Sequence, residues 1–348
     1  MHLTGVLPAM SDLKEVLNAY PQVAMSWDVD LGGVVLELDA KKLEYADFAN
    51  EDPEEIARLI SYLPALEEVN MKGYDIPVET VAAIARENPH VKFLCDVQIG
   101  PCTFSSDVTE IDLSGYEMED VSEVEDVLPI FYNLEKVIMC NCGIPNEEMD
   151  ALNKRHEDVR FVWSFWIEHM EVRTDDIYFM PRKYELQCGD ASIQELKYCE
   201  DMICIDIGHA LSVTHIEWAA NMPNLKYLII ADTGVKDLTP LSGLKNLVFL
   251  EIFLSQVRDY TPLLGCTGLE ELNLCYTYGD IEPLTRMTWL KRLWIGNNWR
   301  AYEYKDEFEQ NMPDCEINMK TPSSTGQGWR TTHNYFDMRD VLGMFYMP

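Results

Sequence analysis

The chain has 348 residues, of which 47% are hydrophobic, and a formal net charge of −33 at pH 7. No stretch of 18 uninterrupted apolar residues occurs, so we predict no membrane insertion. An acidic surface repels phosphate backbones, which argues against nucleic acid as a partner. The same charge either attracts a basic partner or only keeps a solvated surface soluble, and the composition leaves both interpretations open.

The N-terminus is predicted to form a cap over residues 1–30. Leu13, Val16 and Leu17 give a short amphipathic helix before Pro21, and Asp12 begins a capping-box spacing. Residues 34–38 are predicted to be the first strand. Residues 1–6 lack the basic start and the apolar core of a signal peptide. Localisation therefore stays open between the cytoplasm and export of a processed fragment.

Residues 31–200 contain an internal duplication at an offset of 68 residues. Leu66-Glu67 recurs as Leu134-Glu135, and the same offset relates three further pairs of segments. These are Ile76-Pro77 with Ile144-Pro145, Val91-Lys92-Phe93 with Val159-Arg160-Phe161, and Ser106-Asp107 with Thr174-Asp175. Each copy reads as strand, turn, helix and strand. We therefore predict irregular repeats with helices on the convex side.

Residues 201–298 contain a shorter and more regular repeat. L-x-x-L-x-[LI] recurs from Leu225, Leu247, Leu269 and Leu290, at spacings of 22, 22 and 21 residues. Self-similarity at this period with this internal spacing is the signature of a leucine-rich repeat. One unit buries too little apolar surface to fold alone, whereas stacked units share a continuous core. The predicted fold is an α/β leucine-rich repeat solenoid, with a curved parallel sheet on its concave face.

Residues 299–348 are predicted to form a C-terminal cap and tail. Tyr335, Met338, Val341 and Leu342 share one face of a helix. Trp329 and Phe336 are costly to leave exposed, which predicts that the tail docks on the rest of the protein.

The 225–298 block resembles the 22-residue repeats of bacterial leucine-rich repeat proteins of the internalin type. The chain also looks like a group of such proteins from gut-dwelling clostridia, which share Phe179-Met180-Pro181, Leu274-Cys275-Tyr276-Thr277 and the tail Trp329-Arg330…Met338-Arg339-Asp340. The resemblance implies a binding scaffold and names no ligand.

No motif for catalysis or metal binding occurs in the sequence. Its seven histidines form no H-E-x-x-H, and neither a nucleophile-elbow nor a phosphate-loop pattern is present. Cys140 or Cys142 could act as a nucleophile, but a buried strand cysteine is the favoured interpretation of both. We predict a non-enzymatic protein that needs no cofactor and no metal.

The candidate site is the concave strand face of the regular repeats. Strand side chains alternate between the two faces of a sheet, so the residues between the repeat leucines point outward in columns. The predicted binding residues are Tyr227, Ile229, Phe249, Glu251, Phe253, Glu271, Asn273, Arg292 and Trp294. Aromatic side chains with a charged rim are typical of the centre of a protein or peptide interface.

Two alternatives to a protein or peptide partner remain at this point. The aromatic rings could stack on a sugar, in a carbohydrate-binding module or an unrecognised hydrolase. The C-terminal tail or the 320–328 loop could also fold back over this face and cover it.

Overall fold

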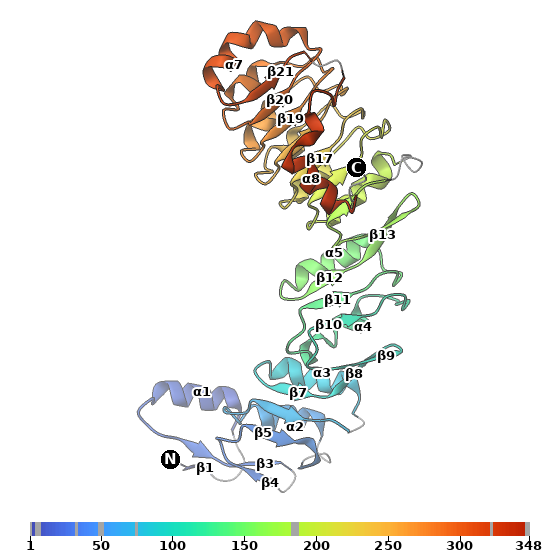
Figure 1. The fold of residues 1–348 in the computed structure, drawn as a ribbon. Helices are drawn as coiled ribbons and strands as arrows, with labels where there is room; N and C mark the ends of the chain where they lie inside the picture. Colours follow the sequence, from blue (N-terminus) through green and yellow to red (C-terminus); the bar gives the residue numbers. More distant parts are fainter. Residues whose placement is uncertain are drawn as a thin grey trace. The chain divides into compact units, whose positions relative to one another are not determined.

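The computed structural model describes residues 2–3, 8–31, 34–47, 52–73, 76–181, 188–320 and 323–344. The chain forms two compact units, Met1–Phe161 (unit 1) and Val162–Pro348 (unit 2). Short strands joined by helices and turns recur in each unit (Figure 1). No helix of the described residues is long and apolar enough to cross a membrane.

Unit 1 combines parallel repeat strands with antiparallel hairpins. Its helices are α1 (Met10–Ala19), α2 (Pro53–Ile60), α3 (Val78–Glu87), α4 (Ser122–Glu125) and α5 (Asn146–Arg155), with 3₁₀ turns η1 (Tyr45–Asp47) and η2 (Leu128–Ile130). The strand pairs are β1 (His2–Leu3) with β2 (Ser26–Trp27), β3 (Val29–Leu31) with β4 (Val34–Leu36), and β8 (Asp96–Ile99) with β9 (Cys102–Ser105). The three-stranded sheets are β5 (Lys42–Glu44), β6 (Glu68–Asn70), β7 (Lys92–Leu94) and β10 (Glu110–Asp112), β11 (Lys136–Ile138), β12 (Arg160–Val162).

Unit 2 is built on one seven-stranded parallel sheet. In spatial order its strands are β15 (Tyr178–Phe179), β16 (Cys204–Asp206), β17 (Tyr227–Ile229), β18 (Phe249–Glu251), β19 (Glu271–Asn273), β20 (Arg292–Trp294) and β21 (Glu316–Asn318). A hairpin, β13 (Ser164–Ile167) with β14 (Met170–Arg173), precedes the sheet. The helices are α6 (Asp190–Ile193), α7 (Lys305–Asn311) and α8 (His333–Val341). The 3₁₀ turns are η3 (Gln194–Tyr198), η4 (Glu217–Asn221), η5 (Thr239–Leu241), η6 (Thr261–Gly265), η7 (Glu282–Arg286), η8 (Trp299–Tyr304) and η9 (Trp329–Thr331).

The predicted solenoid fold is confirmed by this arrangement. Strands follow one another in sequence order through the seven-stranded sheet, and their middle residues Leu228, Leu250, Leu272 and Leu293 are fully buried. A parallel order with one buried face is what stacked leucine-rich repeats require, because each unit completes the core of the next.

The 68-residue duplication is present in the structure as a repeated set of elements. The bounds of β6, α3 and β7 shifted by 68 positions are those of β11, α5 and β12. The same hydroxyl recurs as well, since buried Ser106 Oγ accepts the Cys95 N–H at 3.1 Å and Thr174 Oγ1 accepts the Trp163 N–H at 3.2 Å. The offset therefore marks a real structural module.

Two local predictions in the N-terminal region were wrong. Residues 34–36 do not open the parallel sheet; β4 pairs antiparallel with β3, and β5 is the first strand of that sheet. The register joins Val29 to Leu36 and Leu31 to Val34, so residues 34–36 pair with the preceding strand and not with a repeat strand. Helix α1 begins at Met10, before Asp12, so Asp12 lies in its first turn and caps nothing.

Each regular repeat leaves its strand through a residue in the left-handed region. The residues are His209, Asp232, Leu254, Tyr276 and Asn297, with φ between 53° and 69°. His, Asp and Asn tolerate this region better than other side chains with a Cβ. Leu254 and Tyr276 do not share that tolerance, so two central repeats hold locally unfavourable backbone.

Candidate functional site

The predicted site residues lie side by side on neighbouring strands. The register pairs Tyr227 with Phe249, Phe249 with Glu271, and Glu271 with Arg292. A second column on the same strands joins Ile229, Glu251, Asn273 and Trp294. Phe253 follows β18 and belongs to the same buried cluster. We call the outward side chains of β16–β21 the strand face.

The strand face is covered by residues 323–344, which we call the C-terminal segment. Trp329, Met338 and Leu342 of this segment form one buried cluster with Tyr227, Ile229, Phe249, Phe253 and Trp294. The rings of Phe249 and Trp294 are 0% exposed, so neither offers a surface on which a sugar could stack. Of the two alternatives to a partner, the structure therefore shows the one in which the C-terminal tail folds back over this face.

Trp329 is the central anchor of the C-terminal segment. Its ring lies 5.3 Å from that of Phe249 and 5.2 Å from that of Trp294, measured between centroids. These are favourable separations for tilted aromatic pairs. The indole N–H donates to Glu251 Oε1 at 2.6 Å, which satisfies the polar atom of a fully buried side chain.

Glu251 is a fully buried carboxylate that the C-terminal segment neutralises. Arg330 donates from Nε to Oε1 at 3.0 Å and from Nη2 to Oε2 at 2.6 Å. Among the described residues, the three N–H groups that bond this carboxylate all belong to Trp329 and Arg330. A buried charge is tolerable only when it is paired and hydrogen-bonded, so the face and the segment depend on one another.

A second polar cluster lies on β19 and β20. Arg292 Nη1 is 3.3 Å from Glu271 Oε2, and both side chains are largely buried. Thr332 Oγ1 donates to Glu271 Oε2 at 2.9 Å, and Asn334 Nδ2 donates to Glu271 Oε1 at 3.0 Å. The Arg292 guanidinium also lies 4.4 Å from the centre of the Trp294 ring, a cation–π distance.

Burial and charge shift several pKa values on this face. Burial raises the pKa of Asp206, and Glu251 adds to the rise. Burial also raises the pKa of Tyr227 to about 12. Burial opposes the charge of Arg330, but its hydrogen bond to Glu251 and the carboxylate charge together raise its pKa above the ordinary value. The arginine of the segment is thus held in its charged form by the carboxylate of Glu251.

Sequence reasoning did not identify the residues of the C-terminal segment whose side chains contact the strand face. Trp329 was recognised only as a ring that must dock, and Arg330, Thr332 and Asn334 were not assigned to the site. An acidic residue at an outward position of an apolar strand, Glu251, was the available signal. A buried carboxylate needs a donor from elsewhere, and Arg330 is such a donor.

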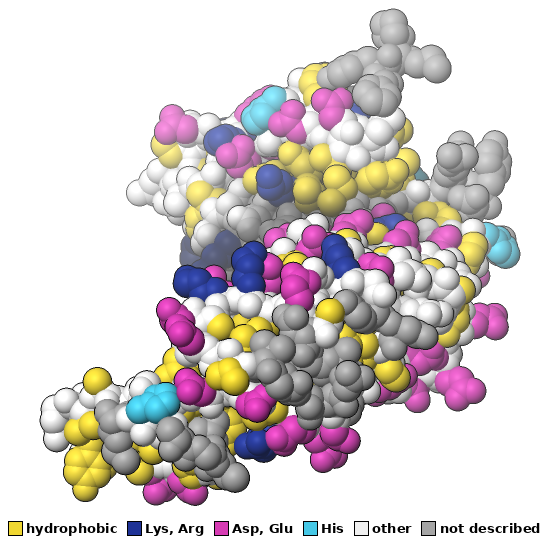
Figure 2. All heavy atoms as spheres, turned by 90° about the horizontal axis from the view of Figure 1, so that it is seen from below, with side chains coloured by type: hydrophobic (Ala, Val, Ile, Leu, Met, Phe, Trp, Pro, Cys, Tyr) yellow, Lys and Arg dark blue, Asp and Glu magenta, His cyan; other side chains and the backbone are white. Residues whose placement is uncertain are grey.

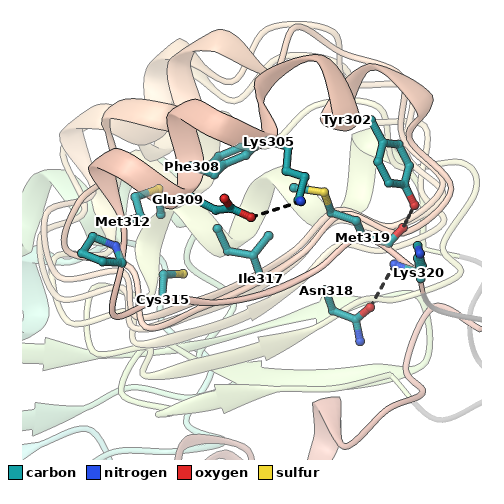
Figure 3. A pocket seen from close by; sticks show the side chains of 11 residues that line it. Tyr302, Lys305, Phe308, Glu309, Met312, Cys315, Ile317, Asn318, Met319 and Lys320 are labelled. Carbon is teal, nitrogen blue, oxygen red and sulfur yellow. Dashed lines mark hydrogen bonds and ion pairs between the residues drawn. The ribbon is translucent and has the colours of Figure 1, made fainter.

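A pocket of about 700 Å³ lies beside the last strand, β21. Its apolar wall includes Phe308, Ile317 and Met319, and Lys305 pairs with Glu309 at 3.2 Å along helix α7 at its edge (Figure 3). The C-terminal segment contributes no residue to the lining of this pocket. The pocket marks the end of the repeat core, which η8, α7 and β21 close.

The chemistry of the cysteines is that of buried thiols. All ten are free, and eight are buried. Burial raises the pKa of Cys142 to about 11. Its thiol donates a hydrogen bond to the Leu113 carbonyl oxygen at 3.2 Å. A protonated thiol is a weak nucleophile. Within the described ranges, no three His, Cys, Asp or Glu side chains are grouped so as to hold a metal ion.

Several solved leucine-rich repeat structures have a similar fold. Internalin C2 of Listeria monocytogenes is 16% identical, with 63% of this chain and 76% of that chain covered, at a TM-score of 0.30. Another Listeria internalin, InlF, is 16% identical, with 96% and 86% covered, at 0.30. A leucine-rich repeat protein of Leptospira interrogans is 13% identical, with 75% and 74% covered, at 0.32.

No protein-family model matches the chain, and no curated protein sequence matches it either. Likenesses this low transfer no ligand and no activity. The class of the protein follows from its own repeats and parallel sheet, which define a leucine-rich repeat protein. The resemblance to proteins of gut-dwelling clostridia stays a prediction.

Proposed function

We propose that this chain is a non-catalytic interaction scaffold whose strand face binds a peptide segment of a partner protein. The partner would contact Tyr227, Ile229, Phe249, Glu251, Phe253, Glu271, Asn273, Arg292 and Trp294. In its absence the C-terminal segment occupies the face. The observation that carries the proposal is that this segment contacts the face as a bound peptide does, with one aromatic anchor and charged contacts around it.

The charge of the face supports a basic partner. Asp206, Glu251, Glu270 and Glu271 place carboxylates on or beside it, and basic or amide side chains of the C-terminal segment contact Glu251, Glu270 and Glu271. Leucine-rich repeat solenoids offer an extended row of strand positions, which suits recognition of a chain segment. The chain as a whole carries a net charge of −33, which would draw a basic peptide toward the protein.

Hydrogen exchange on the full chain tests the proposal. Peptides are first selected from a random library on the wild-type protein. We expect those that bind to raise exchange at amides 324–342 and to leave β17–β19 protected, because the peptide replaces the C-terminal segment on an intact sheet. Amides of β5–β7 in unit 1 serve as the internal reference. Binders that leave exchange at 324–342 unchanged would contradict the proposed site.

A further inference from the structure

The contacts between the C-terminal segment and the strand face are of two kinds. One kind involves the main chain of the segment, and the other involves its side chains and can select a sequence. Four contacts go to main-chain carbonyl oxygens of the segment. Asn273 donates to Ser324 O at 2.7 Å, Trp294 Nε1 to Gly326 O at 3.1 Å, and Arg292 to Gly328 O at 2.9 Å and Trp329 O at 3.0 Å. Every residue carries such a carbonyl, so these contacts hold a peptide in place without selecting its sequence.

Among the side-chain contacts, those to Glu251 select two adjacent residues, Trp329 and Arg330. The slot between Phe249 and Trp294 takes a large flat ring, and Glu251 at the slot accepts a ring N–H. Phenylalanine fills such a slot without supplying that donor. Glu251 Oε1 would then keep only the hydrogen bond from Arg330 Nε, and the buried carboxylate would lose one of its three donors, which weakens binding.

The second selected residue is an arginine. The two hydrogen bonds from Arg330 to Glu251 are bidentate, and only the planar guanidinium supplies two N–H groups in this geometry. A lysine offers a single ammonium point and cannot use both carboxylate oxygens in the same way. Arg330 also lies 5.6 Å from the centre of the Tyr335 ring, which places a second contact on its guanidinium.

We propose that the ligand of the strand face is a peptide with a tryptophan followed by an arginine, read jointly by Glu251. This inference rests on the proposed function and narrows its partner class. The C-terminal segment carries this pair itself, at Trp329-Arg330. It therefore occupies the site that a Trp-Arg peptide of a partner would have to take over. Glu251 is the residue that determines specificity. The main chain of the peptide is held by hydrogen bonds from Arg292, Trp294 and Asn273.

The test separates the C-terminal segment from the repeats without removing it. A specific protease site is inserted between Lys320 and Ser323 of the full chain, and the folded protein is cut there. The probe is a labelled synthetic peptide with the sequence of residues 323–344, followed by fluorescence anisotropy. We expect it to exchange with the resident segment in the cut chain. The uncut chain should bind little of it, because its own segment competes at an effective concentration in the millimolar range.

Peptide variants then measure the selectivity. Peptides with Arg330→Lys or Trp329→Phe should bind about tenfold or more weakly than the native peptide, since each loses a hydrogen bond to a charged buried group. His333→Gln, at an exposed position of the segment, is the matched control and should bind as the native peptide does. In a cut chain with Glu251→Gln, the preference for arginine over lysine should fall to about twofold or less.

The outcomes distinguish the two proposals. Equal binding of the native, lysine and phenylalanine peptides would overturn the Trp-Arg ligand and leave a peptide-binding face. Failure of every peptide to enter a folded cut chain, or unfolding of the chain on cutting, would make the segment an inseparable part of the core and would overturn both. Loss of folding in the Glu251→Gln chain alone leaves the peptide series on the wild-type cut chain to decide.

Discussion

The outward positions of the repeat strands carry different kinds of side chain in the two units. In unit 1 most of the outward residues are charged, and several of them contact residues on the neighbouring strand. Lys42 pairs with Glu68 at 2.8 Å, Asn70 donates to Glu44 at 3.0 Å, and Lys136 lies 3.8 Å from Glu110. In unit 2 the equivalent positions carry Phe249, Trp294 and their neighbours, buried under the C-terminal segment.

The difference teaches which positions a solenoid must keep and which it can vary. The middle residue of each strand is buried in both units, as with Val69 and Leu250, because it fills the shared core. The outward positions are free of that demand. Charged side chains there can remain in water, whereas a row of aromatic side chains needs a cover, and in unit 2 the chain supplies its own.

Charge follows the same division. Unit 1 carries 33 acidic against 11 basic residues, and unit 2 carries 27 against 16. Acidic side chains outnumber Lys and Arg on the molecular face drawn in Figure 2. Two arginines of unit 2, Arg292 and Arg330, pair with the carboxylates of Glu271 and Glu251 on its strand face.

The largest expected effect separates a buried from an exposed tryptophan in unit 2. Trp329→Ala should lower the free energy of unfolding by about 3–5 kcal/mol, because it empties the slot and removes a donor from Glu251. Trp166→Ala, on a hairpin where the ring is 57% exposed, should change it by less than about 0.5 kcal/mol. Urea unfolding of unit 2 measures both. Equal losses would contradict the anchoring role of Trp329.

The next largest effect is the dependence of the stability of unit 1 on pH. The hydrogen bond from Arg155, aided by His156, lowers the pKa of Glu125 from 4.5 to about 2, against the effect of its partial burial. A lowered folded-state pKa stabilises the fold above the unfolded value, and this stability is lost as pH falls from about 4.5 toward 2.

The variant Glu125→Gln should therefore lose about 1–2 kcal/mol near pH 7, after allowance for solvent screening, and little near pH 2. Thermal melts between pH 2 and pH 7 measure the difference. The same loss at every pH would show that packing, and not charge, explains the role of Glu125.

The smallest effect tests the left-handed turns of the regular repeats. Leu254 has φ of +58° and is 44% exposed, so Leu254→Asn should raise the free energy of unfolding by about 0.5–1 kcal/mol. Asn297→Leu, at the same position of a later repeat, should lower it by a similar amount. A destabilised Leu254→Asn chain would indicate that this leucine is held by contacts that outweigh its backbone strain.

The repeats of this protein can be located from the order of its residues alone. Spacing alone located the strands at Leu225, Leu247, Leu269 and Leu290, because a side-chain period of two and a repeat of about 22 residues leave one register that buries every leucine. The offset of 68 residues located the modules of the first half for the same reason. Both patterns are local and repeat many times.

What covers the strand face became known from long-range packing alone. Trp329 and Arg330 stand 78 and 79 positions from Glu251 in the sequence and meet it through one docking event that no periodicity encodes. The sequence could say that buried aromatic rings need a cover and that a tail with exposed rings needs a place to dock. It offered the docking of the tail on this face as one alternative, but it could not assign Trp329 and Arg330 to Glu251, because a single long-range contact leaves no repeated signal along the chain.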